Sequence, residues 1–383
     1  MANRVLLNET SYFGAGAINY IPDIALTRGY KKAFIVTDAG LVKFGVVKKV
    51  TDILDRHNLK YSCFDEVTPN PTIENVHYGI DAYKRAGADY IIAIGGGSPI
   101  DTSKAIGIVV NNPEFSDIRS LEGNATTKNR AVPIIAIPTT AGTATEVTAD
   151  YVITDVENKR KFLCVDAHAI PSVAIVDAEM MSGMPKGLTA ATGMDALTHA
   201  IEAYITKGAC KMTDMYAIKA IELISNSLRK AMENDPIGRE DMSLGQYLAG
   251  VAFSNAGLGL VHSMAHPLSA VYGVPHGVAN AIILPTVMEY NADYSAEKYR
   301  TIADLMGITG VWNVGADEYR KMAVYAVKKL ASDVGIPSKL SDVGVKREDI
   351  PFLAESALKD ACTEGNPRKT SVVDIKKLYE SMM

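Results

Sequence analysis

The feature that most constrains the fold is an alternation, in the first half of the chain, of short apolar runs with segments of helical periodicity. The apolar runs are KKAFIVTDAG (31–40), YSCFDEV (61–67), DYIIAIGGGS (89–98) and VPIIAIPTT (132–140). Segments with helical spacing, such as LVKFGVVKKVTDILDRHN (41–58) and TIENVHYGIDAYKRAGA (72–88), separate them. Strands that are apolar throughout and joined by helices form a parallel sheet covered on both faces. We therefore predict a doubly wound α/β domain over residues 1–184.

The second half of the chain has a different periodicity. A chain of 383 residues exceeds the roughly 250–300 residues at which a single hydrophobic core stops growing, so two domains are expected. After Met184-Pro185, apolar residues recur with a period near 3.6, as in DALTHAIEAYIT, MYAIKAIELISNSLRKAM and QYLAGVAFSNAGLGLVHSMAH. This pattern predicts an all-helical domain over residues 185–383.

Charge and composition exclude several classes of protein. The formal net charge is -5 with acidic and basic residues interspersed, which argues against a nucleic-acid partner. No run of about 18 apolar residues occurs, so no membrane-spanning segment is expected. The N-terminus lacks the basic and apolar regions of a signal peptide, so the cytoplasm is the expected location. Cys63, Cys164, Cys210 and Cys362 show no CxxC spacing and are interpreted as free thiols that mostly fill the core.

Histidines are concentrated in one stretch, GLVHSMAHPLSAVYGVPHG (259–277), which holds three of the seven in the chain. His262 and His266 are four residues apart and share a helix face, and His276 follows a turn that could fold it back toward them. Asp195 and His199 have the same spacing on an upstream apolar helix. A carboxylate with imidazoles and no thiolate suits Zn²⁺ or Fe²⁺. The alternative is a set of hydrogen-bonded core histidines and a capping aspartate.

Three loops that follow predicted strands are candidates for binding a dinucleotide. IIAIGGGSPIDTSKA places Gly95-Gly96-Gly97-Ser98 between a strand and a helix, where the backbone can approach a phosphate. PTTAGTATEVT (138–148) is a second loop of small hydroxyl residues. Asp38 ends a third strand, where a carboxylate can bind a ribose 2′-hydroxyl and select NAD over NADP. The alternatives are plain tight turns and an N-capping aspartate.

These segments belong to a pattern that the chain shares, essentially from end to end, with one known family. The strings that carry the likeness include DYIIAIGGGSPIDTSKAIGI, IPTTAGTATEVT, MPKGLTAATGMDALTHAIEAYIT, SNAGLGLVHSMAHPL and PHGVANAIILP. The chain resembles the iron-containing (group III) alcohol dehydrogenases. The resemblance implies a metal-dependent NAD(H) oxidoreductase with Fe²⁺, or alternatively Zn²⁺, in the helical domain and the dinucleotide on a Rossmann-like domain. It also implies a homodimer, in which NRVLLN near the N-terminus could pair across a two-fold axis.

The resemblance also implies roles for individual residues. The implied metal ligands are Asp195, His199, His262 and His276. His266 would remain unligated near the nicotinamide, where it accepts or relays a proton. The implied cofactor contacts are Asp38, Asn70, Gly95, Gly96, Gly97, Ser98, Asp101, Thr139, Thr140, Thr143 and Lys161. The implied substrate pocket is formed by Asp150, Val152, Phe253 and Leu258, and the reaction is expected in the cleft between the two domains.

The expected substrate is a small alcohol or diol together with its aldehyde. NNPEFSDIRSLEG is typical of the branch that acts on propanediol, so lactaldehyde and 1,2-propanediol are the expected pair. The alternative is a sibling enzyme acting on 1,3-propanediol, ethanol, butanol or glycerol. Ala144-Thr145 replaces a Gly-Ser pair, and Asp150 replaces an asparagine of close relatives and makes the pocket more anionic.

Two more distant alternatives differ in class. Lyases of the dehydroquinate-synthase type share this architecture, but they need several Lys and Arg residues in the helical-domain pocket. The segments flanking His199 and His262 have none at inward spacing. A catalytically silent binding protein is disfavoured because the ligand set and both cofactor loops are intact.

Overall fold

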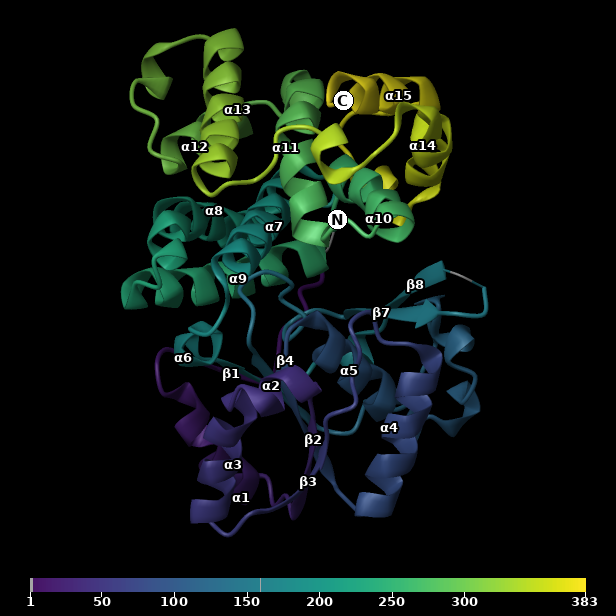
Figure 1. Cartoon of the computed structure of the whole chain (residues 1–383). Coiled ribbons are helices and arrows are strands. Elements are labelled where there is room, and N and C mark those ends of the chain that lie inside the picture. The colour runs from purple at the N-terminus through teal and green to yellow at the C-terminus, as the bar shows by residue number, and fades with distance from the viewer. Residues whose placement is uncertain (1–2, 159) are drawn as a thin grey trace. The chain divides into compact units, whose positions relative to one another are not determined.

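The computed structural model describes residues 3–158 and 160–383. The chain forms two compact units (Figure 1). The sheet unit comprises Leu6–Thr140 and Ala144–Gly183. The helical unit comprises Met184–Met383, the short segment Ala141–Thr143 and a few residues at the N-terminus. The predicted combination of an α/β unit and a helical unit is confirmed.

The main sheet of the sheet unit has six parallel strands in the order β1-β9-β6-β4-β2-β3. Their bounds are β1 (Thr10–Phe13), β2 (Lys32–Val36), β3 (Lys60–Phe64), β4 (Tyr90–Gly95), β6 (Ile134–Pro138) and β9 (Val173–Val176). After β2 the chain adds β3 on one side and then returns to add β4 on the other. The strand order therefore reverses between β2 and β4, and the loops that follow these strands begin side by side at their carboxyl ends.

Helices pack on both faces of this sheet. Along β2, Phe34 and Val36 join a core with α4 and α5, whereas Ile35 joins a second core with α1 and α3. This alternation explains why the strands are apolar at every position. The helices of the unit are α1 (Ile21–Thr27), α2 (Ala39–Lys43), α3 (Val46–Arg56), α4 (Ile73–Ala86), α5 (Gly97–Asn111) and α6 (Ala178–Met181).

Two features of the sheet unit differ from the prediction. The segment 41–58 is not one helix, because Gly45 adopts a left-handed φ of 75° between α2 and α3. A second sheet was not predicted; it has three strands in the order β5-β8-β7, with β7 and β8 antiparallel. Its strands are β5 (Gly123–Asn124), β7 (Asp150–Asp155) and β8 (Arg160–Val165). Buried and more exposed residues alternate along β7 and β8, but the sequence does not show this period of two, because the exposed Val152 and Leu163 are apolar and the buried Asp155 is polar.

The described part of the helical unit contains helices and no strand. Helix α7 packs against α8 and α9, and α11 packs against both α7 and α10. The helices are α7 (Lys186–Ile205), α8 (Lys211–Met232), α9 (Pro236–Ala256), α10 (Leu260–Tyr272), α11 (His276–Asn291), α12 (Lys298–Leu305), α13 (Ala316–Asp333), α14 (Ile350–Lys359) and α15 (Val372–Ser381).

The run QYLAGVAFSNAGLGLVHSMAH, which has one continuous helical periodicity, forms parts of two helices. Gly257, with φ of 84°, ends α9, and α10 starts after Gly259. The axes of α9 and α10 differ by 105°. Among the described residues no single helix is long and apolar enough to cross a membrane, although α9 and α10 pass on length and composition when taken together.

Two smaller expectations concern the cysteines and the N-terminus. The four cysteines form no disulfide within the described residues. Of the four, only Cys164 is buried, so the interpretation of most of them as core filler is wrong. Residues 4–8 carry no strand in the single chain, because β1 begins at Thr10.

Candidate metal centre and cofactor loops

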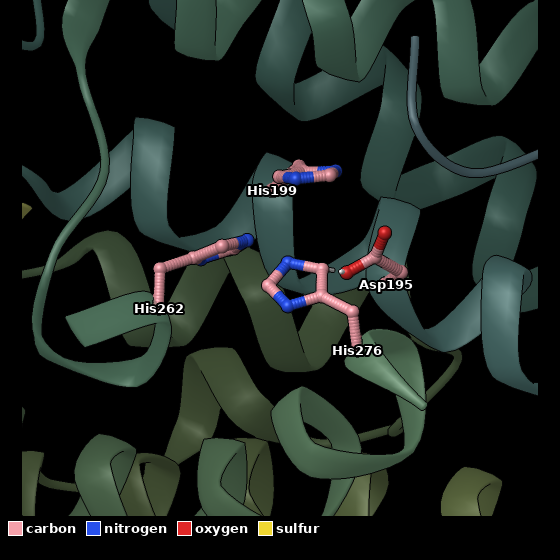
Figure 2. Close-up of side chains that lie close together, drawn as sticks. All are labelled: Asp195, His199, His262 and His276. Carbon is pink, nitrogen blue, oxygen red and sulfur yellow. Dashed lines mark ion pairs between the residues drawn. The ribbon is translucent and has the colours of Figure 1, made fainter. Parts of the chain in front are cut away.

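Four side chains from three helices converge in the helical unit (Figure 2). Asp195 and His199 lie one turn apart on α7, His262 lies on α10, and His276 is the first residue of α11. One ligand atom from each lies within 4.8 Å of the others. Three of the side chains are buried and that of His276 is 38% exposed. The structure thus brings together the four residues that the resemblance implies as metal ligands.

Small residues allow these helices to approach one another. A Cβ atom at Gly277 would lie 2.1 Å from the carbonyl oxygen of Ala191, so only glycine permits the start of α11 to sit against α7. That approach places His276 Nε2 3.7 Å from Asp195 Oδ1. At the start of α10, a Cβ atom at Gly259 would lie 2.9 Å from Glu202 Oε1. The glycines that flank the histidine stretch therefore position its imidazoles.

Burial and mutual proximity set the charges in this cluster. Burial lowers the pKa of His199, and burial together with the neighbouring imidazoles lowers the pKa of His262 well below its ordinary value. Burial by itself would raise the pKa of Asp195, but the three neighbouring imidazoles outweigh it and lower that pKa. At neutral pH the cluster therefore presents the Asp195 carboxylate and the neutral imidazoles of His199 and His262, all three of them buried. This donor set fits a divalent cation such as Fe²⁺ or Zn²⁺.

The amide of Asn280 contacts three of the four candidate ligands. Its Nδ2 donates to Asp195 Oδ1 at 2.7 Å and lies 3.1 Å from both His262 Nε2 and His276 Nε2. Its Oδ1 has no partner among the described residues. Three of the four candidate ligand atoms therefore already surround a partial positive charge, which is the electrostatic environment that a cation needs.

Glu202 is a functional candidate that sequence reasoning missed. Its Oε2 lies 2.7 Å from His262 Nδ1, and its carboxylate also accepts hydrogen bonds from the backbone N–H groups of Gly259 and Val261 at 3.1 and 2.7 Å. Burial raises the pKa of Glu202 to about 7, while these N–H groups favour the carboxylate. With Nδ1–H donating to Glu202, the lone pair of His262 Nε2 faces the cluster. The missed signal was a carboxylate three residues after His199 on an otherwise apolar helix.

His266 does not join the four ligand candidates, although it shares a helix with His262. Its Nδ1 lies 2.7 Å from Asp360 Oδ2, and its ring stacks on that of His276 with centroids 5.4 Å apart. Asp360 also caps the short 3-10 helix η9 (Ala361–Gly365) through Cys362 N–H. The spacing of the three histidines left open which of them converge, and the structure separates His266 from the other two.

In the sheet unit, the predicted cofactor loops follow three neighbouring strands. Asp38 follows β2, Gly95-Gly96 ends β4 and starts α5, and Thr139-Thr140 follows β6. Because these strands are adjacent and parallel, all three loops lie at the same edge of the sheet, next to the reversal of strand order. Thr143 belongs to the segment that groups with the helical unit.

The glycine turn forms a cradle that side chains would fill. A Cβ atom at Gly95 would lie 2.3 Å from Pro99 Cγ, and one at Gly96 would lie 3.2 Å from Thr140 Oγ1. Gly96 caps α5 without a side-chain hydrogen bond, so N–H groups of the first turn, at Gly97 and Ser98, remain available. Such a helix start fits the pyrophosphate of a dinucleotide.

Of the polar residues assigned to the adenosine end, two are in contact. Lys161 Nζ donates to Asn70 Oδ1 at 2.8 Å, and Asn70 holds a left-handed φ of 57°. Asp38 is the N-cap of α2 and accepts from Leu41 N–H at 3.0 Å. The N-cap alternative for Asp38 is therefore realised, and its role in ribose binding stays a prediction.

A buried charged cluster lies beneath the glycine turn. Asp101 Oδ2 accepts from Val152 N–H at 3.0 Å, and its Oδ1 has no partner among the described residues. Lys104, which sequence reasoning did not select, donates to the carbonyl oxygens of Thr148 and Asp150 at 2.8 and 2.7 Å. Burial raises the pKa of Asp101 to about 7 and that of Asp150 to about 6, while Lys104 opposes both shifts.

The four predicted pocket residues are divided between the two units. Asp150 and Val152 lie on β7 in the sheet unit, whereas Phe253 and Leu258 belong to the helical unit. Phe253 stacks on the candidate ligand His199, with ring centroids 4.3 Å apart. The structure thus places one predicted pocket residue beside the ligand cluster, and the pocket as a whole stays a prediction.

Comparisons with known proteins cover the entire chain. Residues 8–178 match the family described as iron-containing alcohol dehydrogenase, and residues 189–383 match its C-terminal part. The chain is 59% identical to lactaldehyde reductase of Escherichia coli (strain K12) over 381 residues, covering 100% of both. It is 42% identical to the NAD-dependent methanol dehydrogenase of Bacillus methanolicus, covering 97% of this chain and 98% of the relative. A crystal structure of 1,3-propanediol oxidoreductase matches with a TM-score of 0.96 and 43% identity, covering 100% of both chains.

Proposed function

This chain belongs to the iron-containing alcohol dehydrogenase family, and on that premise we propose that it interconverts lactaldehyde and 1,2-propanediol with NADH and NAD. The observation that carries the proposal is the buried set of one carboxylate and three imidazoles within 4.8 Å. The chain is a metal-dependent alcohol dehydrogenase by family. The proposed substrate is taken from lactaldehyde reductase, the relative that is 59% identical over its whole length.

The proposed metal ligands are Asp195, His199, His262 and His276. A bound divalent cation supplies Lewis acidity, which lowers the pKa of an alcohol and polarises an aldehyde carbonyl. Glu202 fixes the tautomer of His262, which reduces the reorganisation that binding requires. Asn280 holds three ligand atoms close together before binding, and its Nδ2 withdraws from them when a cation binds.

His266 is proposed to accept or deliver the proton that accompanies hydride transfer. Its side chain is 42% exposed, so it can exchange protons with water. The carboxylate of Asp360 accepts from Nδ1–H, which leaves Nε2 to act as the acid or base. Imidazole is the side chain most often used for proton transfer in catalysis.

NAD(H) is proposed to bind to residues 1–184, and the metal to residues 185–383. When bound, the nicotinamide supplies or accepts the hydride. The start of α5 at Gly96-Gly97 would hold the pyrophosphate, and Asn70 with Lys161 would contact the adenosine half. The remaining proposed contacts are Asp38, Gly95, Ser98, Asp101, Thr139, Thr140 and Thr143.

A substrate panel tests the proposal. Purified enzyme is reconstituted with Fe²⁺ and separately with Zn²⁺, and NADH formation is followed with (S)-1,2-propanediol, 1,3-propanediol, ethanol, butanol and glycerol. We expect the largest kcat/KM for (S)-1,2-propanediol with Fe²⁺. A larger value for any other alcohol would replace the proposed substrate, and turnover after complete removal of metal would reject the metal's role.

The second candidate is a dehydrogenase for 1,3-propanediol. It is favoured by the structural match of this chain to a 1,3-propanediol oxidoreductase, with a TM-score of 0.96. Asp150 is the proposed determinant, together with Val152, Phe253 and Leu258. Burial keeps its pKa near 6, so at neutral pH its carboxylate accepts hydrogen bonds and repels anionic groups. Comparing kcat/KM of Asp150→Asn and of the unmodified enzyme on both diols measures how much Asp150 contributes to the choice between them.

We propose a homodimer in the cytoplasm. Support for the cytoplasm comes from the absence of disulfides among the described residues, which fits a reducing compartment. Sedimentation analysis tests the dimer, and a monomer at micromolar concentration would reject it.

A further inference from the structure

A second cluster of metal-ligating side chains lies beside the first. His266 of α10 meets Asp360 and Cys362, which flank Ala361 at the start of η9. One ligand atom from each of the three lies within 4.8 Å of the others. We call these three residues the thiol triad. It differs chemically from the first cluster because one of its donors is a sulfur atom.

The local structure already orients two members of the thiol triad. Asp360 Oδ2 is 2.7 Å from His266 Nδ1, while its Oδ1 accepts from Cys362 N–H at 2.9 Å. The hydrogen bond to His266 lowers the pKa of Asp360 to about 2 against the opposing effect of burial, so this carboxylate is ionised at neutral pH. Asp360 can therefore ligate through Oδ2 without losing its bond to the backbone.

The dimensions of the triad suit a small thiophilic cation. Bond lengths of about 2.3 Å to sulfur and about 2.0–2.2 Å to nitrogen and oxygen place tetrahedral ligands about 3.3–3.7 Å apart. The present spacings bracket these values, since Asp360 Oδ2 lies 2.7 Å from His266 Nδ1 and the ligand atoms of all three residues lie within 4.8 Å of one another. The His266 and Asp360 side chains are 42% and 21% exposed, so a cation can enter and water can complete the coordination.

Charge does not prevent occupancy of both clusters. A divalent ion held by Asp360 and the Cys362 thiolate is formally neutral. A divalent ion held by Asp195 and three neutral imidazoles carries one net positive charge. A neutral site next to a singly charged one experiences little Coulomb repulsion.

We propose that His266, Asp360 and Cys362 form a second cation site, selective for thiophilic divalent ions such as Zn²⁺ and Co²⁺. Filling it withdraws His266 from proton transfer, so that excess Zn²⁺ inhibits the enzyme without displacing the first metal. Only this catalytic consequence rests on the proposed function. Binding itself rests on the triad.

Cobalt titration of the metal-free protein under argon tests binding directly. The first cluster offers only nitrogen and oxygen donors, so a thiolate-to-cobalt charge-transfer absorption reports a sulfur ligand. We expect two Co²⁺ per chain, with this absorption developing as the second ion binds. Cys362→Ser should bind one Co²⁺ without the absorption. Cys210→Ser, which alters another partly exposed thiol, should behave as the unmodified protein.

The outcomes separate the two proposals. A single Co²⁺ per chain without charge-transfer absorption would reject the triad site and leave the proposed function standing, as would an absorption that persists in Cys362→Ser. No bound Co²⁺ at all would reject both metal sites.

A kinetic experiment checks the catalytic consequence on iron-loaded enzyme whose iron content is measured after each Zn²⁺ addition. Loss of one of three protein ligands should raise the inhibitory Zn²⁺ concentration at least about tenfold in Cys362→Ser, since weaker outer-shell changes already cost 10–100-fold in metal affinity. Equal Zn²⁺ sensitivity of the two proteins, with iron retained, would overturn the link between the triad and inhibition.

Discussion

Glu202→Gln would test whether a buried carboxylate sets the metal affinity of this enzyme through His262. The side chain is 2% exposed and lies 2.7 Å from His262 Nδ1. Glutamine has the same shape but only one acceptor oxygen, which in the place of Oε1 still accepts from Val261 N–H. Its NH₂ group then takes the place of Oε2, loses the hydrogen bond from Gly259 N–H and donates toward Nδ1. The imidazole must then carry its proton on Nε2, the atom that faces the ligand cluster.

The magnitude follows from this change of tautomer. Removal of an outer-shell partner of a metal-bound histidine costs about 10–100-fold in metal affinity, equivalent to about 1.4–2.7 kcal/mol. The metal-free variant should lose less stability than Glu202→Ala would, because the alanine leaves the backbone N–H groups without acceptors at about 1–3 kcal/mol each. The predicted deficit therefore appears mainly in the metal-bound state.

The assay is competition for Fe²⁺ or Co²⁺ against a chelator of known affinity, combined with thermal unfolding with and without metal. Metal should stabilise the variant less than the unmodified protein, in proportion to its weaker binding. Glu289→Gln is the matched control. Glu289 lies at the other end of α11 from His276, is 56% exposed and pairs with Lys328. Metal affinity in Glu202→Gln within twofold of the unmodified value would refute the reasoning.

Three further predictions concern the metal, the cofactor and pH. His262→Ala should lose bound metal and turnover while NADH binding, followed by fluorescence, is retained; turnover equal to that of the unmodified enzyme would exclude a metal role for His262. Asp38→Ser keeps an N-cap oxygen for α2 but removes a charge, and should shift the kcat/KM ratio toward NADP by about tenfold, or about 1.4 kcal/mol; an unchanged ratio would remove Asp38 as the discriminator. Burial raises the pKa of Asp150 from 3.8 to about 6, so the folded state binds this proton more tightly and the carboxyl costs stability as pH rises through that window. Asp150→Asn should therefore gain unfolding free energy relative to the unmodified protein between pH 4 and pH 7, by at most about 3 kcal/mol. Asp81→Asn, which changes an exposed aspartate, is the control, and a pH-independent difference for Asp150→Asn would contradict the shift.

The sequence predicted the parallel sheet because its signal is local. Every residue of β4 is buried. In the glycine turn that follows, a side chain at Gly95 or Gly96 would collide with Pro99 or crowd Thr140. The same holds for Asp195 and His199, since a spacing of four residues places two side chains on one face of any helix. The periodicity of apolar residues and the spacing of polar ones are enough to predict such features, because the residues that define them are close together in the sequence.

Other features were missed because a local pattern has more than one outcome. The run QYLAGVAFSNAGLGLVHSMAH shows continuous helical periodicity, yet Gly257 ends α9 within it. The sequences of β7 and β8 do not alternate between apolar and polar residues, since Leu163 is exposed and Asp155 is buried; the alternation of burial arises only when the two strands pair as a hairpin. A glycine can be accommodated within a helix or can end it, and packing decides which occurs.

By itself, the sequence determined an α/β unit, a helical unit and an aspartate and three histidines whose residue types suit a divalent cation. Only the tertiary structure decided that His262 faces the cluster while His266, one turn away, turns to Asp360, which is 94 residues further along the chain. It also supplied Glu202, which reaches the start of α10 across 57 to 60 residues of sequence. The physical reason is that the periodicity of a helix fixes which side chains share a face, whereas the partner of that face depends on how closely distant helices pack.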